Sequence, residues 1–103
     1  MKREMYRQGD VLLVSDEVPA TAEEISADDR IVIAYGEATG HAHAISRIQA
    51  RLFAHADSRY IIVGDDGADL THEEHSTIHL PAGAYRIVHQ REYIPESSRL
   101  VLD

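Results

Sequence analysis

Cysteine is absent from this chain of 103 residues. Its absence excludes disulfide bonds, thiolate zinc sites and cysteine nucleophiles together, and it is compatible with a reducing compartment. A basic patch is lacking as well, since 10 scattered Lys and Arg residues stand against 18 acidic ones, for a formal charge of −8. Because nucleic-acid phosphate and anionic membranes are bound through clustered basic residues, we expect neither as a partner.

Long hydrophobic runs are also missing. The first apolar stretch, Val11 to Val14, is far too short for the core of a signal peptide or for a membrane-spanning helix. We therefore expect a cytoplasmic protein. The sequence has no phosphate-binding glycine loop and no nucleophile elbow, which removes two large classes of nucleotide-binding and hydrolytic enzymes from consideration.

Strand-like segments dominate what is present. Short apolar or alternating runs recur at regular spacing between Gly, Asp and Pro residues, a pattern typical of a β-sandwich or β-barrel. At this length we expect one all-β domain over residues 1–103, a barrel or sandwich of about six to eight short strands. The predicted strands lie within 11–14, 30–35, 41–48, 51–55, 59–63, 76–80 and 84–94.

Two segments predict short helical turns. Residues 21–24 and 71–74 each place Glu three residues after Thr, which is the capping-box pattern. The first segment belongs to an acidic, alanine-rich loop. The second would present His72 and His75 on one face of a turn, although neither segment is long enough to be a stable helix by itself.

Histidine is the residue type with the most informative pattern. Four of the seven histidines form two tight pairs, His41 with His43 and His72 with His75. Alternate residues of a strand face the same side, so the imidazoles of the first pair would be able to converge on one ion. The alternative is that these side chains only decorate an exposed strand face or a polar loop.

His89 is a fifth candidate ligand. It lies in an alternating stretch and shares its predicted strand face with Tyr85 and Ile87. A single histidine on such a face is more often a hydrogen-bonded core residue, but beside the two pairs it becomes a candidate third or fourth ligand. His55 and His79 are weaker candidates.

Together the histidines predict a divalent transition-metal site. Nitrogen ligation, with at most one carboxylate, suits Zn, Fe, Ni or Cu and disfavours Ca or Mg. Glu73 and Glu74 are the candidate catalytic residues, because either would serve as a general base, as a further ligand or as the partner that orients an imidazole. Arg86 or Arg91 would then hold the anionic part of a small-molecule ligand.

Two segments of the chain resemble cupins, which are small β-barrels that often hold a metal on a His-x-His strand. The similarity covers residues 36–43, with the His-x-His pair, and residues 80–89, with a Pro-x-Gly turn. The chain departs from the cupin pattern where Arg47 and Ile48 replace a Glu, and where Arg86 replaces a His. The second histidine pair would have to supply the missing ligands.

The whole chain also looks like a group of short, uncharacterised bacterial proteins. The shared segments are Tyr-Arg-Gln-Gly-Asp-Val-Leu at 6–12, Thr-Gly-His-Ala-His at 39–43, Thr-His-Glu-Glu-His at 71–75 and Gln-Arg-Glu-Tyr at 90–93. This resemblance implies no particular activity.

Three functions remain open from the sequence. The first is a metal-binding β-barrel with an open coordination position, in which zinc would activate water for hydrolysis or iron would support oxygen chemistry. The second is a non-enzymatic module with a structural or sensory metal, or with histidines that act as a pH switch. The third is an accessory protein that self-associates through strand edges, for example as a homodimer, with incidental histidines.

Overall fold

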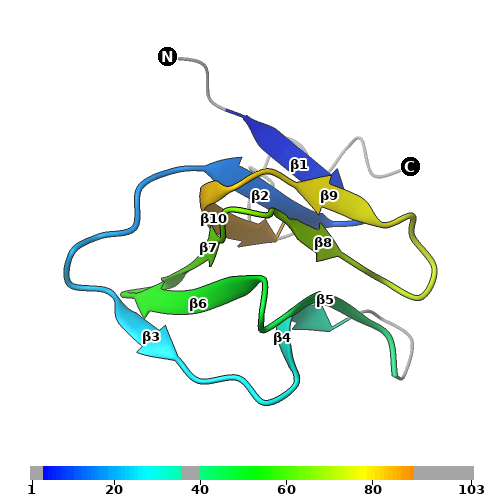
Figure 1. Cartoon of the computed structure of the whole chain (residues 1–103), viewed down its shortest axis with the longest axis horizontal. Coiled ribbons are helices and arrows are strands. Elements are labelled where there is room, and N and C mark those ends of the chain that lie inside the picture. The colour runs from blue at the N-terminus through cyan, green and yellow to red at the C-terminus, as the bar shows by residue number, and fades with distance from the viewer. Residues whose placement is uncertain (1–3, 36–39, 90–103) are drawn as a thin grey trace, which may run out of the picture.

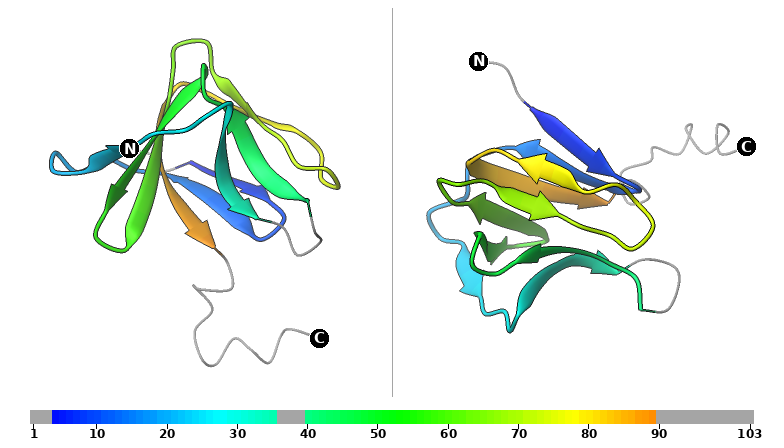
Figure 2. Two further views of the ribbon diagram at one scale, coloured as in Figure 1. Left: turned by 90° about the horizontal axis from the view of Figure 1, so that it is seen from below. Right: turned by 45° about the vertical axis from the view of Figure 1, so that its right-hand side comes forward.

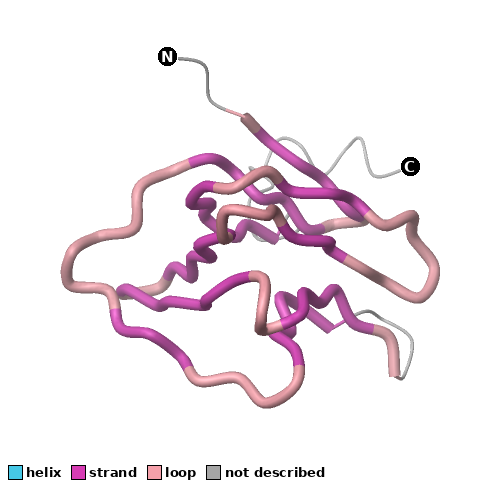
Figure 3. Tube along the Cα trace, in the orientation of Figure 1, coloured by secondary structure: helices cyan, strands magenta, loops and turns pink. Residues whose placement is uncertain are grey.

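The computed structural model describes residues 4–35 and 40–89 (Figure 1). These residues form ten β-strands and no helix, as the tube in Figure 3 shows, which confirms the all-β prediction. The described part of the chain accordingly contains no helix that is long and apolar enough to cross a membrane. The strands are β1 (Met5–Gln8), β2 (Val11–Ser15), β3 (Glu23–Ile25), β4 (Arg30–Tyr35), β5 (Ala42–Ser46), β6 (Ala50–His55), β7 (Ser58–Val63), β8 (Ala68–Leu70), β9 (Ile78–Leu80) and β10 (Gly83–His89).

Each of the seven predicted strand segments overlaps a strand. β4 has the predicted bounds, and β10 begins one residue before the predicted segment. The end of that segment, residues 90–94, lies outside the described residues. The sequence pattern did not reveal β1, β3 and β8, which have only four, three and three residues.

Neither predicted helical turn is present. Glu23–Ile25 is strand β3 and pairs antiparallel with residues 52–54 of β6. Thr71 exchanges backbone hydrogen bonds with Ala44, and the residues after it form a bend. In both places the backbone amides and carbonyls form hydrogen bonds with a neighbouring strand. Such pairing outweighs a capping pattern, which contributes only about 1 kcal/mol.

The strands form one large sheet and two hairpins. The six-stranded sheet has the order β1-β2-β10-β7-β6-β3, and the hairpins are β4–β5 and β8–β9. An isolated antiparallel bridge between Ala44 and Thr71 joins the hairpins. Figure 2 shows that the hairpins stand across from the six-stranded sheet. The predicted barrel is therefore wrong. Among the described strands, no backbone pairing links the hairpins to the large sheet, so the sheets do not close into a barrel.

The side chain of Arg59 links β4 to the large sheet. The register of β4 against β5 shifts between Val32 and Ala34, which leaves Ile33 as an extra residue in the strand. The guanidinium of Arg59, on β7, donates a hydrogen bond to the carbonyl oxygen of Ile33. This contact satisfies a backbone acceptor in β4, which among the described strands pairs only with β5.

The hydrophobic core lies between the large sheet and the two hairpins. All three sheets contribute to it, because strands with one face toward the core alternate inward apolar residues with outward polar ones. Each fully buried aliphatic side chain stabilises the fold by about 1.5–3 kcal/mol. The largest fully buried side chains are Leu13, Ile31, Ile33, Ile45, Ile61, Leu70, Leu80 and Val11.

Candidate metal centre

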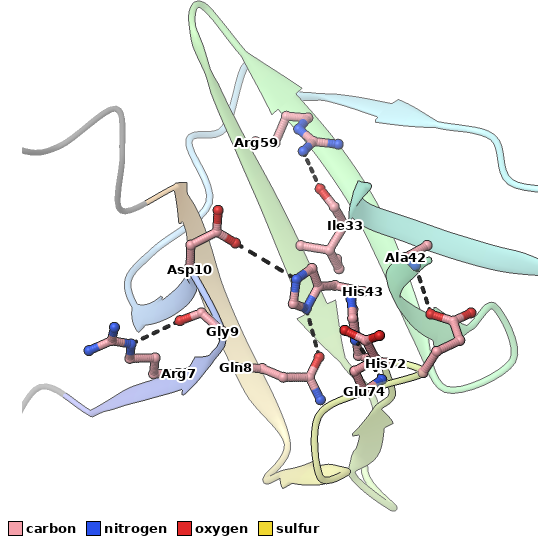
Figure 4. Close-up of polar contacts among 11 residues, drawn as sticks. Arg7, Gln8, Gly9, Asp10, Ile33, Ala42, His43, Arg59, His72 and Glu74 are labelled. Atoms are coloured by element: carbon pink, nitrogen blue, oxygen red, sulfur yellow. Dashed lines mark hydrogen bonds and ion pairs between the residues drawn. The ribbon is translucent and has the colours of Figure 1, made fainter. Parts of the chain in front are cut away.

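Three elements meet where the chain gathers its histidines. They are the start of β5, the turn at Gly9 and Asp10 between β1 and β2, and residues 71–77 between β8 and β9. Figure 4 shows His43 at the centre of this region, with Gln8 and Asp10 on one side and His72 and Glu74 on the other. The three elements are far apart in sequence, so the fold itself creates the cluster.

The bridge between the two hairpins brings the first histidine pair to the second. The amide of Ala44 donates to the carbonyl of Thr71 at 3.0 Å, and the amide of Thr71 donates back at 2.9 Å. His43 precedes one bridge residue and His72 follows the other. Because the strands run antiparallel, these two histidines become neighbours, with ring centroids 4.3 Å apart.

Four of the five predicted ligands come together. The ring of His72 also lies 5.6 Å from that of His41 and 4.7 Å from that of His75, and the rings of His43 and His75 are 5.9 Å apart. His41 and His43 thus contact the same third ring, as expected for residues that alternate along an extended backbone. His72 and His75 are presented together by a bend, and not by the predicted helical turn.

Glu73 completes the tightest donor group. One donor atom each from His41, His72 and Glu73 lies within 4.8 Å of the others. An oxygen of Glu73 accepts a hydrogen bond from the backbone amide of Ala42 at 2.9 Å. This bond, together with the amide of Glu73 itself and the nearby imidazoles, lowers the pKa of the Glu73 carboxyl. The group therefore supplies an anionic oxygen beside two nitrogens.

Glu74 lies at the outer side of the cluster. Its carboxylate is 3.7 Å from Nδ1 of His41, and its side chain is 68% exposed. The amide of Glu74 donates to Nδ1 of His72 at 3.0 Å, so a neutral His72 in this arrangement carries its proton on Nε2. This hydrogen bond must open before His72 can offer a lone pair to a metal ion. The two predicted catalytic glutamates thus occupy different positions, with Glu73 inside the donor group and Glu74 beside it.

His43 is one of two buried polar residues among the described residues, and the other is Gln8. Each is 2% exposed, and Nδ1 of His43 lies 2.8 Å from the side-chain oxygen of Gln8. Nε2 of His43 is 3.8 Å from the carboxylate of Asp10. Burial, followed by the charges of neighbouring histidines, lowers the pKa of His43, while Asp10 opposes the shift. A lowered pKa keeps the imidazole neutral, which is the form that binds metals.

Gly9 gives the imidazoles room to approach the backbone. It has a φ of +62°, which is a left-handed conformation that glycine adopts without strain. A Cβ atom at this position would lie 2.8 Å from Nε2 of His75 and 3.2 Å from Cε1 of His43. The absence of a side chain at Gly9 is therefore part of the site's geometry.

The remaining candidates lie away from these contacts. His89 pairs with Val11 in the large sheet, and its charge reaches His43, but among the described residues no ring contact joins it to the four histidines. The guanidinium of Arg86 is 3.3 Å from the carboxylate of Asp16. Arg91 lies outside the described residues.

Comparison with known proteins identifies the family. A family model described as a domain of unknown function, DUF8820, matches residues 7–90. The chain belongs to the DUF8820 family. A search of curated proteins and a search of solved structures each returned no match.

Sequence reasoning missed two residues of the site in this DUF8820 domain. Gln8 and Asp10 flank Gly9 at the β1–β2 turn, and each lies close to one ring nitrogen of His43. Their polar-glycine-polar pattern is what a solvated turn also shows. A usable signal was the position of Gln8 directly before a turn and a buried strand, which places its side chain next to the core.

Proposed function

We propose that this chain binds one divalent transition-metal ion through His41, His72 and Glu73, with His43 and His75 as further donors. The convergence of the first three donor atoms within 4.8 Å supports the proposal. Donor atoms around a tetrahedral zinc ion lie about 3.4 Å apart, so side-chain movements of about 1 Å, together with release of Nδ1 of His72 from the amide of Glu74, would complete the site. The formal charge of −8 also favours the approach of a cation.

The donor set limits the choice of metal. Imidazole nitrogens with a single carboxylate suit Zn, Fe, Ni or Cu, whereas Ca and Mg prefer sites made of oxygen ligands. Within this group the ligand types alone do not favour one ion. Zinc is the most convenient probe because it undergoes no redox change during a titration.

Catalysis at this metal is the second part of the proposal. The exposed carboxylate of Glu74 lies beside His41 and outside the donor group, where a general base for a metal-bound water would stand. A small molecule would then be hydrolysed, or oxidised if the metal is iron. The alternative is a structural or sensory metal that ties β5 to the connection between β8 and β9.

Metal binding is tested by titrating the purified protein with zinc after chelation and dialysis. We expect one zinc ion per chain by calorimetry, with elemental analysis as a second measure. Loss of an outer partner of a metal ligand costs about 10–100-fold in affinity, so His72→Ala should cost more than about 100-fold. His55→Ala is the matched control, because His55 hydrogen-bonds to Thr21 at the far end of β6. Equal zinc affinity in both variants would refute the proposal.

Chelation distinguishes the catalytic alternative from the structural one. If the metal is structural, its removal should lower the melting temperature sharply. If it is catalytic, the metal-free protein should keep its melting temperature, and Glu74→Gln should abolish an activity without loss of zinc.

The cupin resemblance, a cytoplasmic location and a homodimer remain proposals. β1 and β3 are the outer strands of the large sheet, so a dimer would form by pairing one of them with its copy. Light scattering on the eluting protein would determine the mass in solution.

A further inference from the structure

Gln8 is a buried residue at one side of the histidine cluster, and both polar atoms of its side-chain amide have partners. Its nitrogen donates to the carbonyl oxygens of Leu70 and Ser76, each at 2.9 Å. Its oxygen lies 2.8 Å from Nδ1 of His43. A buried amide with satisfied donors and acceptors has one stable orientation, since a flip would set its nitrogen against Nδ1 and its oxygen against two carbonyls.

This orientation determines which nitrogen of His43 carries the proton. Both N–H groups of the Gln8 amide are used on carbonyl oxygens, so only its acceptor oxygen faces His43. Nδ1 of His43 must therefore be the donor of that hydrogen bond. A neutral imidazole with its proton on Nδ1 has its lone pair on Nε2. In His43 that nitrogen points toward the carboxylate of Asp10, at 3.8 Å.

The same amide also fixes the segment that carries the second histidine pair. Leu70 is the last residue of β8, and Ser76 follows His75 directly. The two hydrogen bonds from Gln8 thus hold both ends of the segment between them, which contains His72 and His75. One side chain on β1 thus contacts His43 directly and holds the backbone on either side of His72 and His75.

We infer that Gln8 is the positioning residue of the metal site, which holds His43 as an Nε2 ligand and anchors both ends of the segment that presents His72 and His75. The inference rests on the proposed metal function and deepens it. Metal-bound histidines generally donate their second N–H to a carbonyl or carboxylate oxygen, which fixes the ring and strengthens the ligand. The amide oxygen of Gln8 is such a partner for His43.

The first test needs no substitution. Long-range ¹H–¹⁵N NMR spectra of the metal-free wild-type protein at pH 8 show which imidazole nitrogen of His43 is protonated. We expect the proton on Nδ1, and zinc should then shift the Nε2 resonance while the Nδ1 proton remains. A proton on Nε2 of His43 in the metal-free protein would overturn the inference.

Two substitutions separate the roles of the amide. Gln8→Met keeps the length of the side chain but removes the acceptor and both donors, so zinc affinity should fall about 10–100-fold and His43 should lose its fixed tautomer. Gln8→Glu keeps an acceptor for His43 and removes the two donors, so the Nδ1 proton should stay while amide exchange speeds up over residues 72–75. Gln49→Met is the matched control, because the Gln49 side chain accepts a backbone hydrogen bond from Asp69 in another region.

The outcomes distinguish this inference from the proposed function. Zinc binding by a wild-type protein whose His43 is protonated on Nε2 would overturn the inference and leave the metal function standing. A wild-type protein that takes up no zinc would overturn the proposed function, and with it the metal role of Gln8. If Gln8→Met does not fold, the wild-type spectrum still decides the tautomer. Zinc affinity as high in a folded Gln8→Met as in Gln49→Met would refute the positioning role.

Discussion

Among the residues that the structure describes, two glycines lie against histidine rings, and only one of these two belongs to a candidate site. Gly9 and Gly67 both have a positive φ, of +62° and +78°. A Cβ atom at Gly9 would meet His75 and His43, and one at Gly67 would lie 2.6 Å from Nε2 of His79. The local geometry is similar in both places, since a glycine without a side chain lets an imidazole approach the backbone.

The surroundings of the two contacts differ. His79 lies directly across from Asp69 in the β8–β9 hairpin, bonds to its carboxylate at 3.0 Å and has a side chain that is 63% exposed. At Gly9, by contrast, the two hairpins and the β1–β2 turn converge, and the buried amide of Gln8 links them. A histidine beside a glycine is therefore no sign of a site by itself. Convergence of elements distant in sequence, with buried polar contacts, is the distinguishing feature.

The largest effect is expected from Gly9→Ala. The substitution forces alanine into a left-handed conformation and sets its Cβ against His75 and His43, so it should cost about 1–3 kcal/mol of stability and most of the zinc affinity. Gly40→Ala is the control, because Gly40 has a φ of +86° but a Cβ there would meet nothing within 4 Å. Thermal melts and zinc titrations of both variants check the result. Wild-type zinc affinity in Gly9→Ala would show that the approach to Gly9 does not matter.

Gly67→Ala should lower stability and leave the metal site intact. Its Cβ would lie 2.9 Å from the carbonyl oxygen of Leu80 as well as against the His79 ring, so the hairpin must shift. We expect a loss of about 1–3 kcal/mol, as at Gly9, because the backbone strain is similar. Zinc affinity should match that of the wild type. A parallel loss of zinc binding would mean that the two glycine contacts are not independent.

Acidification should destabilise the metal-free protein through His43. The pKa of His43 is lowered in the folded state by burial, while in the unfolded chain it has its ordinary value of about 6.5. Above pH 6.5 neither state takes up the proton, so stability is unaffected. As pH falls through 6.5 the unfolded chain is protonated first, and stability declines until pH passes below the folded-state pKa.

Denaturant melts between pH 8 and pH 5 measure this decline. His43→Gln cannot be protonated at this position, so its stability should fall less steeply below pH 6.5, while the two proteins should run parallel between pH 7 and pH 8. Identical slopes below pH 6.5 would assign the decline to other groups.

The smallest effect is expected from His79→Ala. It removes an exposed cross-strand contact between the imidazole and the carboxylate of Asp69, and such pairs contribute about 0.2–1 kcal/mol. Zinc affinity should stay at the wild-type value. A large loss of zinc affinity would indicate that His79 belongs to the metal site, and the two glycine contacts would then not differ in function.

Much of the fold was predictable, because apolar strand segments repeat between turn residues. β4 and β7 carry dense Ile and Val runs, so local sequence determines them. The short strand β3, Glu-Glu-Ile, exists because it pairs with β6, and no local pattern signals that pairing. For the same reason the capping-box pattern at residues 21–24 gave the wrong local structure.

The candidate ligands of the site were predictable from the sequence, but the contacts that bring them together were not. The paired spacing of the histidines marks them in the sequence. That they converge depends on the bridge between Ala44 and Thr71, which joins residues 27 positions apart and has no sequence signature. Gln8 was not predicted as a site residue, because the sequence does not directly distinguish a buried glutamine from a solvated one.

The bridge between Ala44 and Thr71 has one more consequence. Its two amides are each held by a single partner across the junction of the hairpins, at 3.0 and 2.9 Å. Opening of this junction would separate His43 from His72 and expose both amides to solvent in the same event. The deuterium uptake of these two amides therefore reports directly on how often the cluster comes apart, and an ion held by both hairpins would slow that uptake in proportion to its occupancy.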